Sequence, residues 1–470
     1  MADSPAGGGP APGDLRLTPR EVLGKPRQVD PATQDPRGAA GFLDGGSLVT
    51  TPTGGPGTAT LTSLRGFGIS PMPKRRPPAA EDALARVVLD RYLAVRPGET
   101  VAIETWSHGL RWARPFLVEA RRRGANPTLL VEDENAFFRS LEELGSAALA
   151  RRPRALAPRG GVHVYLGGPE AFPRLFGLPP SDVERLMVRH DVAWWRAART
   201  SRTRVVRLAL GEATPTAAAR YGVDVESWQA ELLRASLVPP NRLAAEGRRL
   251  VHALGRGRRL RVRHPNGTDL TFVRGLQAPS VRTGRPDRAP PGAWGSAPSG
   301  LLVVPIRRGT ADGIWETNRP TYDRFAQPPV ARGGRFRFQV GRLVEFSFDQ
   351  GGTSFAAAYR HAGPGRERPV ALTVGLNPAI SHAPEALELA SGTLGLLLGD
   401  PPYRDGRPRS GFSFLATLAG ADVDIDARPW LVRGSAPAPR GRRHPTGPGG
   451  RRYKLKRSAK ATRKARTFPR

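Results

Sequence analysis

The chain has 470 residues, a formal net charge of +32 and no cysteine. The length predicts two or three domains, and the lack of cysteine excludes disulfides, thiolate metal sites and a cysteine nucleophile. No apolar run reaches the ~18–20 residues that span a bilayer. The first residues also lack the basic-then-apolar pattern of a secretory signal. We therefore expect a cytoplasmic protein without a membrane partner.

Residues 1–80 are rich in glycine and proline, which together account for 27 of these positions. The segment shows no sustained period of 2 or 3.6 residues. Such a composition cannot bury enough apolar surface to offset the loss of chain entropy on folding. We predict a disordered extension over residues 1–80.

Helical and strand patterns alternate after residue 81. An apolar helical stripe starts at Leu84, and an alternating strand follows over residues 100–104. A second stripe starts at Leu110 and ends before Gly124, which suits a helix cap. Another strand is expected over residues 128–132. The same alternation continues with a helix over 137–144 and strands over 162–166 and 204–210. It predicts an α/β domain with an open parallel sheet over residues 81–250.

Strand patterns dominate after residue 250. Residues 259–264 and 268–273 flank Asn266-Gly267, a pair typical of a two-residue hairpin turn. Only residues 384–390 suggest a short helix, with a proline at its start. Further strands are expected over 301–306, 336–340, 343–348, 355–359, 391–398 and 412–426. We predict a mostly antiparallel β domain over residues 251–435.

The C-terminal segment 436–470 is basic and is predicted to be disordered. Residues 439–470 contain 13 basic residues and no acidic one. Such a segment can bind nucleic acid or another polyanion through charge alone, and it can also arise from compositional drift. Both interpretations remain open. The candidate nucleic-acid-binding residues are Arg451, Arg452, Lys454, Lys456, Arg457, Lys460, Arg463 and Lys464.

Six short motifs occur in order between residues 81 and 435. They are LAVRPGETV (93–101), NGTDLTF (266–272), APSG (297–300), GLNP (375–378), SGTL (391–394) and LGD (398–400). In this order they resemble the motifs of the aminopeptidase T family of metallo-aminopeptidases. The resemblance implies an α/β domain, a β-rich domain with a two-metal peptidase site, and a homodimer. In that family, two Glu, two His, an Asp and a Tyr hold the ions, which polarise a peptide carbonyl and activate water.

The chain departs from this pattern where the resemblance places metal ligands. The two glutamate positions carry Leu301 and Ala371, a histidine position carries Gly395, and the closing His/Asp region corresponds to residues 410–415 (SGFSFL). Carbon side chains cannot coordinate a divalent ion. We therefore assign no catalytic residue and expect no cofactor. The favoured interpretation is a pseudoenzyme that serves as a structural or binding scaffold, close to the ligand-poor members of the family.

An active enzyme with displaced ligands is the alternative. His382 follows the GLNP motif, and Asp400 closes the last motif. A histidine and a carboxylate of this kind could hold Zn²⁺ or Co²⁺ in a metal-dependent aminopeptidase. In the opposing interpretation, His382 is a loop residue and Asp400 caps a turn.

Overall fold

The computed structural model describes residues 80–149, 159–170, 174, 186, 197–286, 294–323, 326–399 and 412–435. By its internal contacts the chain divides into a unit of residues 1–436 and a second unit of residues 437–470. The segments predicted to be disordered lie outside the described residues, apart from Ala80. Among the described residues, no helix is long and apolar enough to cross a membrane.

A five-stranded parallel sheet forms the N-terminal part. Its strands are β1 (Thr100–Trp106), β2 (Asn126–Glu132), β3 (Val162–Leu166), β4 (Arg204–Leu208) and β8 (Trp294–Ala297). Their order across the sheet is β2-β1-β3-β4-β8, and every pairing is parallel. The predicted open α/β sheet is confirmed.

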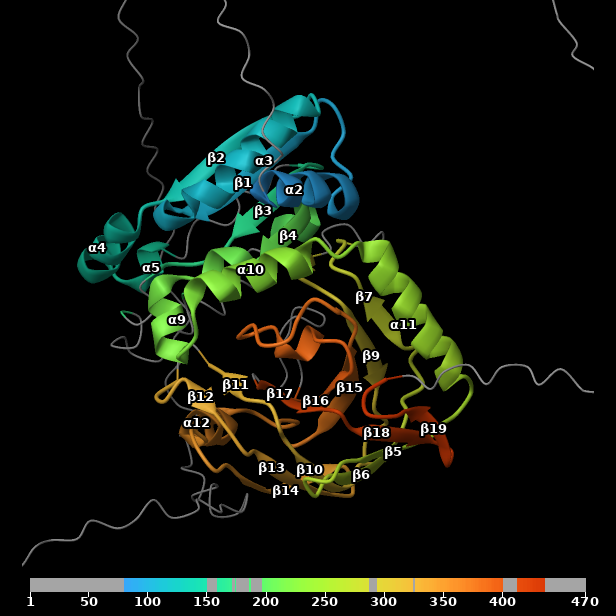
Figure 1. The fold of residues 1–470 in the computed structure, drawn as a ribbon. Helices are drawn as coiled ribbons and strands as arrows, with labels where there is room; N and C mark the ends of the chain where they lie inside the picture. Colours follow the sequence, from blue (N-terminus) through green and yellow to red (C-terminus); the bar gives the residue numbers. More distant parts are fainter. Residues whose placement is uncertain are drawn as a thin grey trace, which may run out of the picture. The chain divides into compact units, whose positions relative to one another are not determined.

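Helices with local start and stop signals connect these strands. Asp133 caps α4 by accepting a hydrogen bond from Ala136 N, and Thr214 caps α9 in the same way. Helices α2, α3 and α10 pack together beside the parallel sheet (Figure 1). The bounds are α2 (Ala80–Val87), the π-helical turn η1 (Val88–Tyr92), the 3₁₀ turn η2 (Ser107–Gly109), α3 (Leu110–Arg122), α4 (Glu134–Leu144), α5 (Ser146–Leu149), the 3₁₀ turn η5 (Ala209–Glu212), α9 (Pro215–Tyr221), α10 (Val225–Ser236) and α11 (Pro240–Leu254).

The C-terminal part is built from antiparallel strands, as predicted. A seven-stranded sheet has the order β14-β13-β10-β6-β5-β18-β19, and a five-stranded sheet has the order β17-β16-β15-β9-β7. The strands are β5 (Arg259–Arg263), β6 (Asp269–Val273), β7 (Ser280–Arg282), β9 (Leu301–Pro305), β10 (Asp312–Glu316), β13 (Arg335–Gln339), β14 (Arg342–Ser347), β15 (Pro369–Gly375), β16 (Thr393–Gly399), β17 (Ser413–Ala419), β18 (Asp422–Ile425) and β19 (Arg428–Leu431). A small hairpin joins β11 (Thr321–Tyr322) to β12 (Val330–Ala331).

The two antiparallel sheets bury their facing side chains in one core. In the five-stranded sheet, alternate residues such as Leu302, Leu372 and Leu396 point into this core. They join Phe272 and Trp315 of the seven-stranded sheet. The residues between them, such as Leu301, therefore point to the opposite face of the five-stranded sheet. We call this the outer face of the β9-β15-β16-β17 sheet.

Three predicted elements differ from the structure. Residues 355–359 lie in a helix, α12 (Thr353–His361), because Phe355, Ala356 and Tyr359 share a buried helical face and the alanines favour a helix. The predicted strand over 412–426 is two strands, β17 and β18, which belong to different sheets. The predicted helix over 384–390 is reduced to the 3₁₀ turn η6 (Leu387–Leu389).

Strand β8 follows the N-terminal half in sequence but pairs with β4 of the parallel sheet. Ala297 at its end belongs to the N-terminal core. The chain thus returns to the parallel sheet after it has already formed β5, β6 and β7.

Candidate functional site

The register of the antiparallel strands brings the expected ligand positions together on the outer face of the β9-β15-β16-β17 sheet. Gly375 pairs with Leu301, and Thr373 pairs with Gly395. Because directly paired residues in antiparallel strands lie on the same face, Leu301, Ala371 and Gly395 share the outer face. Leu415 of the closing region lies on it as well. Residues 410 and 411 of that region lie outside the described residues.

The side chains around Gly395 fill the space at this position. A Cβ atom added to Gly395 would lie 2.4 Å from Thr373 Oγ1 and 2.8 Å from Leu415 Cδ1. Ala371 is buried, and Leu301 and Leu415 are half-buried. An imidazole at position 395 would therefore require displacement of Leu415.

His382 lies at the surface, in the loop that follows β15. Its backbone N–H and that of Ala383 donate to Glu231 Oε1 on α10, at 2.9 and 3.2 Å, and Ser381 N donates to the same atom. The buried carboxylate thus holds the backbone of the loop, while the His382 side chain is exposed. Asp400 lies outside the described residues, so their use as a ligand pair stays a prediction. The candidate nucleic-acid-binding residues of the tail also lie outside the described residues.

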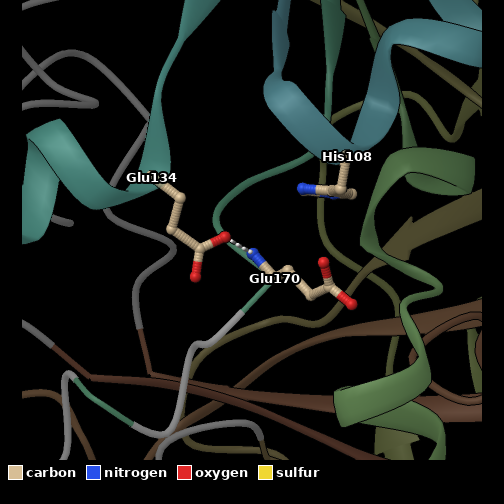
Figure 2. Close-up of side chains that lie close together, drawn as sticks. All are labelled: His108, Glu134 and Glu170. Carbon is tan, nitrogen blue, oxygen red and sulfur yellow. Dashed lines mark hydrogen bonds between the residues drawn. The ribbon is translucent and has the colours of Figure 1, made fainter.

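A second group of chemistry-bearing side chains lies in the α/β part. One ring nitrogen of His108 and one carboxylate oxygen each of Glu134 and Glu170 lie within 4.8 Å of one another, and all three residues are half-buried. Figure 2 shows these side chains close together, with the Glu170 backbone N–H bonded to Glu134. Among the described residues, this is the only group of three or more His, Asp or Glu whose ligand atoms approach so closely.

The sequence analysis did not single out these three residues. Each follows the carboxyl end of a strand of the parallel sheet: His108 follows β1, Glu134 follows β2 and Glu170 follows β3. Ligands of open α/β sheets bind beyond these strand ends. The polar residues within four positions of the end of each predicted strand were therefore the signal that could have found the group.

One small cavity lies between α12 and the β11–β12 hairpin. It has a volume of about 170 Å³, and its lining includes Asp323, Ser354, Phe355, Phe412 and Phe414. Sites for small organic ligands usually measure roughly 300–1,000 Å³. The cavity is too small for a ligand of that kind, and we assign it no function.

Comparison of the sequence with protein-family profiles and with curated proteins finds no match. Among solved structures, AmpT from Thermus thermophilus, an aminopeptidase T, is similar at 18% identity and a TM-score of 0.57. The match covers 76% of this chain and 98% of AmpT. The chain has the fold of aminopeptidase T. A 2,5-dihydroxypyridine dioxygenase from Pseudomonas putida KT2440 is also similar, at 14% identity and a TM-score of 0.48, over 77% of this chain and 97% of the enzyme.

Four described positions on the outer face do not fit the dinuclear metal group that the resemblance of the sequence motifs implies. Two divalent ions require carboxylate and imidazole donors about 2.0–2.2 Å from each ion. Leu301, Ala371, Gly395 and Leu415 offer carbon and hydrogen, and Thr373 Oγ1, which lies beside Gly395, belongs to a neutral hydroxyl. We therefore derive no catalytic step through metal ions at this face.

Glu388 in η6 has a strongly perturbed carboxyl group. Burial raises its pKa from 4.5 to about 7; a hydrogen bond with its own backbone opposes this shift, and the nearby Glu385 carboxylate adds to it. The Glu385 carboxylate in turn accepts a hydrogen bond from the Tyr221 hydroxyl. A raised pKa often marks a functional group, although structural burial has the same effect.

We expect Glu388 to make the protein less stable as the pH rises. The folded state holds the Glu388 proton more tightly than the unfolded chain does, so this contribution is complete below pH 4.5 and is lost as the pH approaches about 7. Urea denaturation at several pH values should show the free energy of unfolding decreasing across this window. The decrease should be smaller in Glu388→Gln and unchanged in the exposed control Glu143→Gln. An identical slope in Glu388→Gln would contradict the assignment.

Proposed function

We propose that this chain is an aminopeptidase T-like protein without a dinuclear metal centre, which acts as a non-catalytic structural or binding scaffold. The observation that carries the proposal is the chemistry of the outer face. The strand register gathers the expected ligand positions, and the side chains there are Leu301, Ala371, Gly395 and Leu415.

Electrostatics supports the same proposal. Two divalent cations bring four positive charges to a partly buried surface, and carboxylates must neutralise them. An uncompensated charge in such a place carries a large desolvation penalty. The packing of Thr373 and Leu415 over Gly395 fills the space that a ligand side chain would need. The loss of one ligand could be offset by a neighbouring donor, whereas four expected ligand positions without a carboxylate or an imidazole give the ions no anchor.

The proposal predicts that the purified chain does not catalyse metal-dependent aminopeptidase turnover. Release of p-nitroaniline from a panel of aminoacyl p-nitroanilides should stay at the buffer rate with Zn²⁺, Co²⁺ or Mn²⁺ added. A chelator-sensitive rate that saturates with substrate would contradict the proposal.

A variant tests the alternative interpretation, in which displaced ligands hold the metal of an active enzyme. If turnover is observed, His382→Ala tests whether the exposed imidazole holds the metal. Loss of activity in His382→Ala, with binding of two ions per wild-type chain, would establish the enzyme interpretation in place of the scaffold. Activity that persists in this variant would exclude His382 as the ligand and still contradict the scaffold.

A further inference from the structure

The group formed by His108, Glu134 and Glu170 lies where an α/β sheet usually binds its ligand. The strand order β2-β1-β3-β4 means that the chain moves outward from β1 to β2 and then returns to the other side of β1. The carboxyl ends of parallel strands on the two sides of such a reversal form the usual ligand position of open α/β sheets. The three residues come from the segments that follow the three strands at this reversal.

One nitrogen of the His108 imidazole has a backbone partner, and the other has none. Its Nε2 atom lies 3.2 Å from the carbonyl oxygen of Gly211, so we assign the proton to Nε2 as the donor. The other nitrogen, Nδ1, is buried and has no hydrogen-bond partner among the described residues. Metal-binding histidines usually donate one ring N–H to a carbonyl or carboxylate and coordinate through the other nitrogen. A buried lone pair without a partner is otherwise costly.

Backbone packing fixes the carbonyl group that orients His108. A Cβ atom at Gly167 would lie 2.5 Å from the Gly211 carbonyl group, and a Cβ at Gly211 would lie 2.7 Å from the carbonyl carbon of Leu166. The two glycines therefore let the segment after β3 and the turn η5 touch through their backbones. This contact holds the Gly211 carbonyl in place and, through it, the His108 ring.

A hydrogen bond links the two residues that carry the carboxylates. Glu134 is the first residue of α4, directly after the cap Asp133, and its Oε2 accepts a hydrogen bond of 2.9 Å from Glu170 N. This bond draws the segment after β3 toward the start of α4. Two carboxylates at this separation repel each other, and a bound cation would convert that repulsion into attraction.

We propose that His108, Glu134 and Glu170 bind one divalent transition-metal ion. One imidazole nitrogen and two carboxylate oxygens suit Zn²⁺ or Mn²⁺ better than Ca²⁺ or Mg²⁺, which prefer oxygen ligands alone. Ligand atoms about 2.1 Å from a tetrahedral ion lie about 3.4 Å from one another. The Glu134 and Glu170 side chains must therefore rotate slightly to bring the three ligand atoms closer together than they are in this structure. Three protein ligands leave a coordination position for water or for an anionic ligand.

Zinc titration of the full-length chain tests this site. After the protein is stripped with a chelator and dialysed, calorimetry and elemental analysis should give one Zn²⁺ per wild-type chain. His108→Ala and Glu170→Gln should each weaken binding at least as much as the roughly 10–100-fold cost of losing an outer hydrogen-bond partner of a ligand. The control variants His252→Ala and Glu143→Gln, both at exposed positions, should bind as the wild type does.

Three outcomes would overturn the site. The first is a wild-type chain that binds no Zn²⁺, and the second is a folded Glu170→Gln variant with wild-type affinity. If His108→Ala fails to fold, Glu170→Gln alone tests the site. The amide keeps the size of the side chain, so this variant is expected to fold. Two ions that remain bound in both variants would overturn the site and would also contradict the proposed loss of the dinuclear centre. Loss of the bound Zn²⁺ in both variants would support the site, and it would leave the proposed scaffold function unaffected.

Discussion

Replacement of Phe355 by alanine is expected to lower the free energy of unfolding by about 3–5 kcal/mol, because it removes the centre of an aromatic cluster that joins α12 to the antiparallel sheets. Phe355 lies on α12 and is 4% exposed. Its ring contacts Phe346 and Phe414 at centroid distances of 4.8 and 4.7 Å, in edge-to-face geometry. It also contacts Phe336, Phe348, Tyr359 and Phe412. The loss therefore weakens the contact of α12 with both antiparallel sheets.

Urea denaturation followed by far-UV circular dichroism measures this effect. Leu276→Ala serves as the control, because Leu276 is 94% exposed and should change the stability by less than about 0.5 kcal/mol. Phe355→Leu should restore part of the loss, because it refills part of the volume. Equal stability of Phe355→Ala and the control would show that α12 does not pack as described.

Replacement of Asn377 by alanine should lower the free energy of unfolding by about 3 kcal/mol, because it removes three hydrogen bonds made by a fully buried side chain. Asn377 is fully buried in the GLNP motif. Its Nδ2 donates to the carbonyl oxygens of Ala235 and Ser299, at 3.0 and 2.8 Å, and its Oδ1 accepts from Ala379 N at 3.0 Å. One side chain therefore links α10 of the α/β part to the strands of the β part.

The same denaturation experiment tests Asn377, with Asn241→Ala as a matched control. Asn241 is exposed, and its Oδ1 accepts a hydrogen bond only from the next residue, Arg242, among the bonds described. Asn377→Asp should be at least as unfavourable as Asn377→Ala, because it removes both donors and buries a charge. A change of less than about 1 kcal/mol in Asn377→Ala would contradict the linking role.

Elements with local signals could be predicted from the sequence. Strand β3 coincides with the predicted residues 162–166, because a short run rich in β-forming residues has glycine pairs on both sides. The hairpin of β5 and β6 was predicted from Asn266-Gly267: Asn266 Oδ1 accepts from Thr268 N, and Gly267 has a φ of +107°. In these elements, the local turn chemistry and the tertiary packing agree.

Elements that depend on distant partners could not be predicted in the same way. The run 412–426 looks like one strand, but Gly420, with a φ of +74°, turns the chain so that β17 and β18 enter different sheets. Residues 355–359 form an apolar run too short to separate helix from strand by its period. Their helical state follows from the aromatic neighbours that surround Phe355 in the folded protein.

Prediction of the candidate sites was likewise limited to features that local sequence determines. The positions Leu301, Ala371 and Gly395 could be picked out by their motifs, and the strand register then placed them on one face. The group of His108, Glu134 and Glu170 depends on the order of three strands and on the carbonyl of Gly211. Neither the strand order nor the carbonyl position can be predicted from local sequence.

The return of β8 to the parallel sheet has a consequence for any attempt to produce the two halves separately. A fragment that stops at residue 250, where the composition changes, would lack Trp294–Ala297 and would leave the hydrogen-bonding edge of β4 bare. A bare strand edge is a template for intermolecular β-pairing and aggregation. The two halves are interleaved along the chain, so they should be produced together as a single polypeptide.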